Sequence, residues 1–286
     1  MSQKLTCETV GGIKCYSSGV ADSYTDYPDA GFDVTDKLEA DSFWVRSRNR
    51  LIKHLVHKYA SRTAKTRFLD IGCGTGAVIQ GIIDDANLEI TGSEIYLKGL
   101  LYAKSKLPRV DFIQFDVTQG ILPAQFDMIG AFDVIEHIEN DVAAIANIHE
   151  MLSDDGYFIV TVPQYMFLWS KLDTIVKHKR RYSKKELLLK LRQQGFAISY
   201  SSSFLFALFP LMLISRLLDR KDSGNKADME FEKRVRFPKV LNWIFDKIMR
   251  IDEVLIRLGV SLPCGGSLLV VAKKRRATDT QTAKPA

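Results

Sequence analysis

The chain has 286 residues, of which 46% are hydrophobic, and it carries a formal net charge of +6. These values predict a folded protein with one large core, alone or with a smaller added unit. Its four cysteines, Cys7, Cys15, Cys73 and Cys264, exclude a disulfide scaffold and a zinc knuckle because they lack the paired spacing of such sites.

The basic residues stand mostly beside acids, except in VKHKRRYSKK and in AKKRRA. These two clusters are either solvated faces or contacts to a phosphate or phospholipid, and both interpretations stay open. The first residues, MSQKLTCETVGG, lack the basic and apolar segments of a secretory signal. We therefore expect a cytoplasmic protein.

In chain order, residues 1 to about 35 predict an irregular arm, and an amphipathic helix is predicted from about residue 35 to 59. Apolar strand-like runs then alternate with helical patterns, at 67–72, 88–94, 110–116, 126–133, 156–163 and 196–203. A last strand-like run, 265–274, follows after a long interruption. This alternation predicts a Rossmann-like, mostly parallel seven-stranded sheet with helices on both faces.

Four units of the chain follow from this pattern. We expect an N-terminal arm and helix (1–59), a Rossmann-like core (60–203 and 264–276), a helical insertion before the last strand (204–263) and a disordered tail (277–286).

The first strand runs into a glycine-rich turn, FLDIGCGTGAV, which fits either a dinucleotide or S-adenosylmethionine. Acids at the strand ends help to decide between them: Asp70, Glu94, Asp116 and Asp133. In a doubly wound sheet they meet at the edge where ligands bind. An acidic rim repels a pyrophosphate but suits the ammonium, sulfonium and hydroxyl groups of the methyl donor.

These residues resemble the class I S-adenosylmethionine-dependent methyltransferases, through LDIGCGTG, GSEIY, FDV, FDMIGAFDVIEHI and the GYFIVTVP strand. The resemblance implies that a methionine moiety lies against Asp70, Gly72, Gly74 and Gly76. It further implies that Glu94 accepts the ribose hydroxyls, that Asp116 and Val117 meet the adenine, and that Ile95 packs on the adenine face. Asp133 completes the implied cofactor site.

Two further segments, FWVRSRNR and HKRRY, are similar to a bacterial subgroup of these enzymes with F-W-x-x-R-x-R and H-x-R-R-Y elements. We expect Trp44 and Arg48 to close over the cofactor, with the guanidinium pairing the methionine carboxylate. The alternative is a surface helix with a core tryptophan and solvated arginines.

The segment VIEHI, residues 134–138, is expected to open the helix after the fourth strand, beside the transferable methyl. His137 is the best candidate for a base, with Glu136 next to it. The series Asp133, Glu136 and His137 is also similar to the E-x-x-E-H of quinone-biosynthesis and small-RNA methyltransferases. That similarity implies a divalent cation with His178, a possibility that the shorter aspartate and the following RRY weaken.

The apolar run 204–218 breaks at Pro210 and meets Arg216 too soon to span a bilayer, and an amphipathic stretch follows at 238–258. We expect it to cap a lipid-like acceptor pocket, with core packing, an oligomer contact or peripheral membrane contact as alternatives. In the cap hypothesis Arg180 or Arg181 holds a phosphate or carboxylate at the mouth, and Tyr182 donates a hydrogen bond.

The sequence thus predicts S-adenosylmethionine-dependent methyl transfer to oxygen or nitrogen of a small-molecule or lipid-like acceptor. No nucleic-acid partner is expected, and the oligomeric state stays open. The alternatives are an NAD(P)-dependent oxidoreductase, which Asp70 beside the glycine turn argues against, and a non-catalytic cofactor-binding module.

Overall fold

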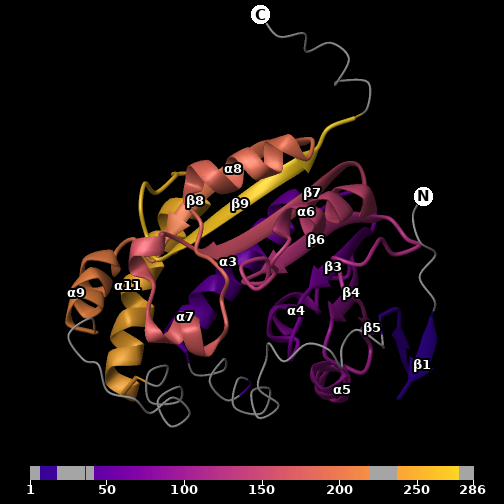
Figure 1. The fold of residues 1–286 in the computed structure, drawn as a ribbon, viewed down its shortest axis with the longest axis horizontal. Helices are drawn as coiled ribbons and strands as arrows, with labels where there is room; N and C mark the ends of the chain where they lie inside the picture. The colour runs from indigo at the N-terminus through magenta and orange to yellow at the C-terminus, as the bar shows by residue number, and fades with distance from the viewer. Residues whose placement is uncertain (1–6, 18–35, 37–41, 220–236, 277–286) are drawn as a thin grey trace, which may run out of the picture.

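The computed structural model describes residues 7–17, 36, 42–219 and 237–276 (Figure 1). The predicted disordered tail, 277–286, lies outside these residues.

The centre of the molecule is one twisted sheet with the strand order β1-β2-β5-β4-β3-β6-β7-β9-β8 (Figure 1). The pairs from β5 to β7 are parallel, and β9 runs antiparallel to both of its neighbours. The predicted strands are all present, with these bounds: β3 Thr66–Ile71, β4 Leu88–Glu94, β5 Asp111–Gln114, β6 Phe126–Phe132, β7 Leu152–Pro163, β8 Phe196–Phe204 and β9 Ser267–Lys274. The Rossmann-like prediction is confirmed.

The strand count of seven was too low. Two short strands, β1 (Glu8–Val10) and β2 (Ile13–Cys15), form a hairpin in the arm that we expected to be irregular. Strand β2 then pairs in parallel with β5. Three residues are too few to show an alternating pattern, so only the pairing partner reveals these strands.

Helices cover both faces of the sheet, as predicted (Figure 1). One core cluster joins the sheet to α6 (Asp141–Met151) and α8 (Lys184–Gln193). The other joins it to α3 (Phe43–Tyr59), α4 (Ala77–Ile82) and α11 (Lys239–Arg257). The remaining helices are α5 (Leu97–Lys106), η1 (Met166–Leu168), α7 (Lys171–Ile175) and α9 (Phe209–Asp219).

The insertion before the last strand packs on the N-terminal helix. The hydroxyl of Ser47 on α3 donates to Oε1 of Glu253 on α11 at 2.9 Å, and Arg50 pairs with Asp246 at 2.9 Å. Asp252 of α11 accepts from the backbone N–H groups of Phe206 and Ala207 just before α9. The acidic side chains of α11 therefore face the protein, together with the apolar side chains of Met249 and Ile256.

Across the part of the chain that the structure describes, every helix is too short or too polar to cross a membrane.

Candidate functional site

A cavity of about 500 Å³ opens at the carboxyl ends of β3, β4, β5 and β6. Its walls come from the glycine turn, the strand ends that follow it, and the loop between β6 and α6. Of the predicted cofactor residues, the lining includes Arg48, Asp70, Gly72, Gly74, Glu94, Ile95, Asp116, Val117 and Asp133. A volume of this size suits a ligand as large as a nucleoside conjugate.

The glycine turn is shaped by close contacts. Gly72 has a φ of +68°, and a Cβ there would lie 2.5 Å from Cγ2 of Val134. Gly74 turns its backbone N–H toward Oε2 of Glu94, 3.2 Å away. Gly76 caps α4 with a φ of +82° and is not among the lining residues within the described chain. Its role in the structure is conformational.

Asp70, at the end of β3, is 1% exposed and lines the cavity. Its Oδ2 has no hydrogen-bond partner among the described residues. Burial raises the pKa of this carboxyl to about 8, against the opposing charge of Arg48. A buried carboxylate oxygen without a donor is costly, so the site suits a ligand that brings a positive donor such as an ammonium.

Glu94 ends β4 and holds its carboxylate with backbone amides. Oε1 accepts from the N–H of Ile95 at 2.7 Å, and Oε2 accepts from the N–H of Gly74. Burial raises the pKa of Glu94, while these backbone bonds oppose the rise. The carboxylate is thus fixed at the cavity wall beside Ile95, a place that suits the diol of a ribose.

Asp116 and Val117 follow β5 and also line the cavity. Oδ1 of Asp116 accepts from the backbone N–H and the hydroxyl of Thr118, at 2.8 and 2.7 Å. The Val117 carbonyl accepts from the Asn147 side chain at 2.7 Å. The segment is therefore rigid before any ligand arrives.

Arg48 reaches the cavity from α3. Its Nη1 lies 2.6 Å from Oδ2 of Asp133, and both side chains are largely buried. The guanidinium also stacks over the ring of Trp44, 4.9 Å from its centroid. Trp44 itself is not among the lining residues that the structure describes, so it supports Arg48 rather than covering the cavity.

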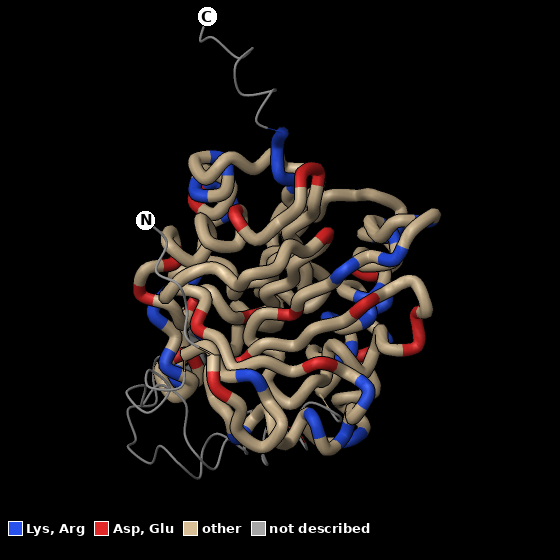
Figure 2. Tube along the Cα trace, turned by 90° about the vertical axis from the view of Figure 1, so that its right-hand side faces the viewer, with Lys and Arg blue, Asp and Glu red and all other residues tan. Residues whose placement is uncertain are grey.

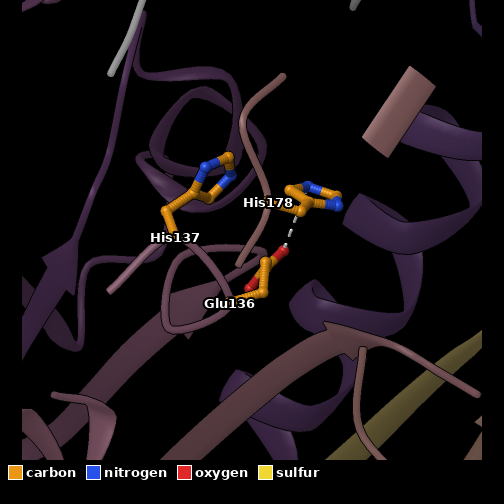
Figure 3. A group of neighbouring side chains, drawn as sticks. All are labelled: Glu136, His137 and His178. Carbon is orange, nitrogen blue, oxygen red and sulfur yellow. Dashed lines mark ion pairs between the residues drawn. The ribbon is translucent and has the colours of Figure 1, made fainter. Parts of the chain in front are cut away.

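Glu136, His137 and His178 lie together beside the cavity (Figure 3). The expectation that VIEHI opens a helix is wrong: this segment is a turn, and α6 begins at Asp141 after the N-cap Asn140. The turn points the His137 ring into the cavity lining and sets it 4.7 Å from the His178 ring, centroid to centroid.

Burial and the nearby His178 and Lys179 lower the pKa of His137 to about 3. Its imidazole is therefore neutral at neutral pH. Glu136 is fully buried, neither of its carboxylate oxygens has a hydrogen-bond partner within the described chain, and burial raises its pKa well above the usual range.

Asp173 of α7 orients His178. Its Oδ1 lies 2.8 Å from Nδ1 of His178, which leaves Nε2 directed at Glu136, 3.9 Å from Oε1. The ligand atoms of Glu136, His137 and His178 all lie within 4.8 Å of one another. A histidine that a carboxylate holds in place, and that faces two further side chains able to bind a metal, is typical of metal sites. Asp133 does not belong to this group because Arg48 pairs with it.

The acceptor-binding roles predicted for the HKRRY segment do not match its placement. Tyr182 is fully buried and donates to Oδ2 of Asp141 at 2.6 Å. Arg181 forms two bonds with Asp173, at 2.7 and 3.0 Å, and Arg180 pairs with Asp141 at 3.1 Å. All three side chains are therefore held by acids, and none of the three lines the cavity within the described chain.

Lys179 is the residue of this segment that lines the cavity, and the sequence reasoning missed it. Its backbone N–H donates to the carbonyl of Glu136 at 2.8 Å, which ties the two loops together. The basic run showed that a cation could lie near the site. An irregular loop has no regular spacing of inward and outward side chains, however, so the sequence did not reveal which cation faces the cavity.

The insertion is absent from the cavity wall. None of the described residues between 204 and 263 lines it.

A family model described as a methyltransferase domain matches residues 44–200, more than half of the chain. A "Probable S-adenosylmethionine-dependent methyltransferase" of Mycolicibacterium smegmatis is 26% identical over 164 residues, covering 56% of this chain and 62% of that protein. The chain spans about three-fifths of the length of the curated relatives it matches.

Solved structures share the fold. A phosphoethanolamine N-methyltransferase of Haemonchus contortus, solved with S-adenosyl-L-methionine, has a TM-score of 0.57 at 16% identity and covers 91% of this chain and 60% of its own. The [4+2]-cyclase SpnF has a TM-score of 0.52 at 21% identity and covers 79% and 80%. Because a cyclase stands beside a methyltransferase, the likeness shows the fold alone.

Proposed function

We propose that this chain, which belongs to the methyltransferase-domain family, transfers a methyl group from S-adenosylmethionine, and we propose an acceptor class and a proton acceptor for it. In the proposed binding mode Asp70 accepts the methionine ammonium, and Glu94 accepts the ribose hydroxyls. Asp116 and Val117 hold the adenine, and Ile95 packs on its face. The unpartnered oxygen of Asp70 is the observation that best supports this orientation.

In this orientation the methionine end lies beside Asp133 and His137, so the acceptor enters between His137 and Lys179. Methyl transfer is an in-line displacement, and the enzyme's main tasks are to align the acceptor atom and exclude water. A hydroxyl or a neutral N–H group must also lose a proton as it is alkylated. We assign that proton to the neutral imidazole of His137, the ring that lines this end of the cavity.

A pKa near 3 makes His137 a weak base toward a resting hydroxyl. The proton on an oxygen that is being alkylated becomes far more acidic, however, because positive charge develops on that oxygen. A weak base with a fixed position then suffices. The low pKa also keeps the ring unprotonated at neutral pH.

Lys179 indicates which charge the acceptor carries. Its side chain lines the mouth, where its positive charge favours an anionic group such as a carboxylate or phosphate. We therefore propose a small-molecule or lipid-like acceptor with an oxygen or nitrogen nucleophile and an acidic group nearby.

The first step of the test is to identify the methylated product. The purified protein is incubated with cell extract and isotopically labelled methyl donor, and labelled products are found by mass spectrometry. With the identified acceptor, His137→Asn is expected to lower kcat at least about a hundredfold. Cofactor affinity should stay unchanged, and His57→Asn on the surface serves as control. Full activity of His137→Asn would contradict the assignment.

A divalent cation is a second candidate feature of the site, supported by the two oxygens of buried Glu136 that have no hydrogen-bond donor among the described residues. The residues fit such an ion in chemistry: His137, His178 and Glu136 would hold it. Two imidazoles with one carboxylate suit zinc, manganese or iron better than magnesium, which prefers oxygen ligands. When bound, the ion would polarise an acceptor oxygen.

A further inference from the structure

Helix α11 buries its acidic side chains together with Met249 and Ile256, and it exposes a second set of apolar side chains. Its three acids point into the protein: Asp252 and Glu253 are at most 1% exposed, and the Asp246 side chain is 13% exposed. They are satisfied there by Arg50 and Ser47 of α3 and by the backbone N–H groups before α9. The outward side of the helix is therefore left without negative charge.

Six apolar side chains occupy that outward side. They recur along the whole helix, and the largest is Trp243, which is 61% exposed; the set is Val240, Leu241, Trp243, Ile244, Ile251 and Val254. Between Val240 and Val254 they form a strip about 21 Å long. Single exposed apolar residues are ordinary, but a continuous strip of this length indicates a binding surface.

The other exposed residues of α11 are all basic: Lys239, Lys247, Arg250 and Arg257. Lys247 also lies over the Trp243 ring, 5.6 Å from its centroid. Apolar residues with a tryptophan, flanked only by cations, are typical of helices that lie in a membrane interface.

Two further elements, α9 and η1, also carry exposed apolar side chains. Leu211 and Ile214 of α9 are 49% and 55% exposed. The ring of Phe209, at the start of α9, lies 6.2 Å from that of Tyr165, which stacks on Phe167 of η1. Phe167 is 51% exposed, and it stands next to the segment that carries Asp173 and His178. We call α11, α9 and η1 together the apolar face.

We propose that the apolar face binds the surface of an anionic phospholipid membrane. The apolar side chains enter the headgroup region, and the four cations of α11 pair with lipid phosphates. The sequence analysis considered a peripheral membrane contact through residues 204–218 alone. The proposed membrane contact is larger, and α11 is its main element.

The charge pattern favours a membrane over a second copy of this chain. An isologous dimer through α11 would bring two sets of four cations together, of which only Arg250 is paired with an acid of the same helix, Glu253. The basic end of β9 is a separate feature: Lys273 and Arg276 pair there with Asp155, at the opposite end of the molecule from α11 (Figure 1). Figure 2 shows how widely the other cations are spread among acids.

The test is sedimentation of the full chain with phospholipid vesicles. We expect binding to vesicles of phosphatidylcholine with phosphatidylglycerol, much weaker binding to phosphatidylcholine alone, and release by salt. Replacing Lys247 or Arg257 with Gln should lower partitioning about fivefold each. The double variant Trp243→Glu and Val254→Glu should abolish it. Emission of Trp243 should shift to the blue on vesicles, and Trp243→Phe should remove that shift.

The matched control is Leu189→Glu with Val142→Glu, two exposed apolar residues on α8 and α6, which should bind vesicles like the wild type. Calorimetry with S-adenosylmethionine shows that each variant is folded and reports on the catalytic site separately. Equal binding to neutral and anionic vesicles, or wild-type binding by the Trp243→Glu and Val254→Glu variant, would overturn the proposal. A dimer in light scattering that this variant dissociates would assign the face to self-association instead.

Discussion

Arg48 on the N-terminal helix and Asp133 after β6 form an ion pair of 2.6 Å in the wall of the cavity beside the glycine turn. Asp133 has a φ of +57°, a strained conformation for a residue other than glycine. The pair therefore fixes both the strained loop that leads to His137 and the position of α3 over the sheet.

The first prediction concerns this pair. Asp133→Asn leaves the Arg48 guanidinium buried without its anion, and we expect the free energy of unfolding to fall by about 1–3 kcal/mol. A double-mutant cycle with Arg48→Met, measured by denaturant unfolding, should give a coupling energy of at least about 1 kcal/mol. The exposed pair Arg67 and Asp127 is the control, and its coupling should be smaller. Equal coupling in both pairs would show that the buried pair has no special role.

The second prediction concerns Glu94. Its replacement by Ala removes two charge-assisted hydrogen bonds to the proposed ribose, so cofactor binding should weaken by about 2–3 kcal/mol. Calorimetry measures this directly. Glu89→Ala on the exposed side of the same strand is the control, with wild-type affinity expected. An unchanged dissociation constant for Glu94→Ala would move the ribose site elsewhere.

The third prediction follows from the raised pKa of Asp70, about 8. At pH 7 most molecules hold a proton on this carboxyl. Binding the methionine ammonium favours the charged form, so the pKa falls and the proton leaves. Cofactor binding at pH 7 should therefore release close to one proton, and the release should shrink above pH 8, where Asp70 is already ionised.

Calorimetry in two buffers of different ionisation enthalpy measures the proton count. Asp70→Asn should bind more weakly and lose this release. If wild type and variant release equal numbers of protons, the ammonium does not bind at Asp70.

The fourth prediction tests the cation site. Manganese or zinc added to protein stripped by a chelator should raise the melting temperature, because a ligand that binds the folded state stabilises it. Glu136→Gln and His178→Gln should remove that rise. Glu139→Gln, on an exposed neighbour, should keep it. A rise that survives in Glu136→Gln would place the metal elsewhere on the protein.

The sequence was sufficient for features that depend on local pattern. The alternation of strands and helices predicted the sheet, and the run 88–94 has the bounds of β4. The acids of the strand ends could be assigned to one edge because parallel strands place their carboxyl ends together. Asp70 and Glu94 accordingly line one cavity.

Features that depend on partners distant in the chain were decided only by the tertiary structure. Hydrophobic periodicity marks the apolar positions of 238–258, but it does not say which of them are buried. The ion pairs with Arg50 hold the acids of α11 inward, beside Met249 and Ile256. In the HKRRY segment, Asp141 binds Tyr182 and Arg180, and Asp173 binds Arg181. Lys179 is the residue of this segment that lines the cavity. A buried acid stabilises whichever donor reaches it, and only the fold determines which donor that is.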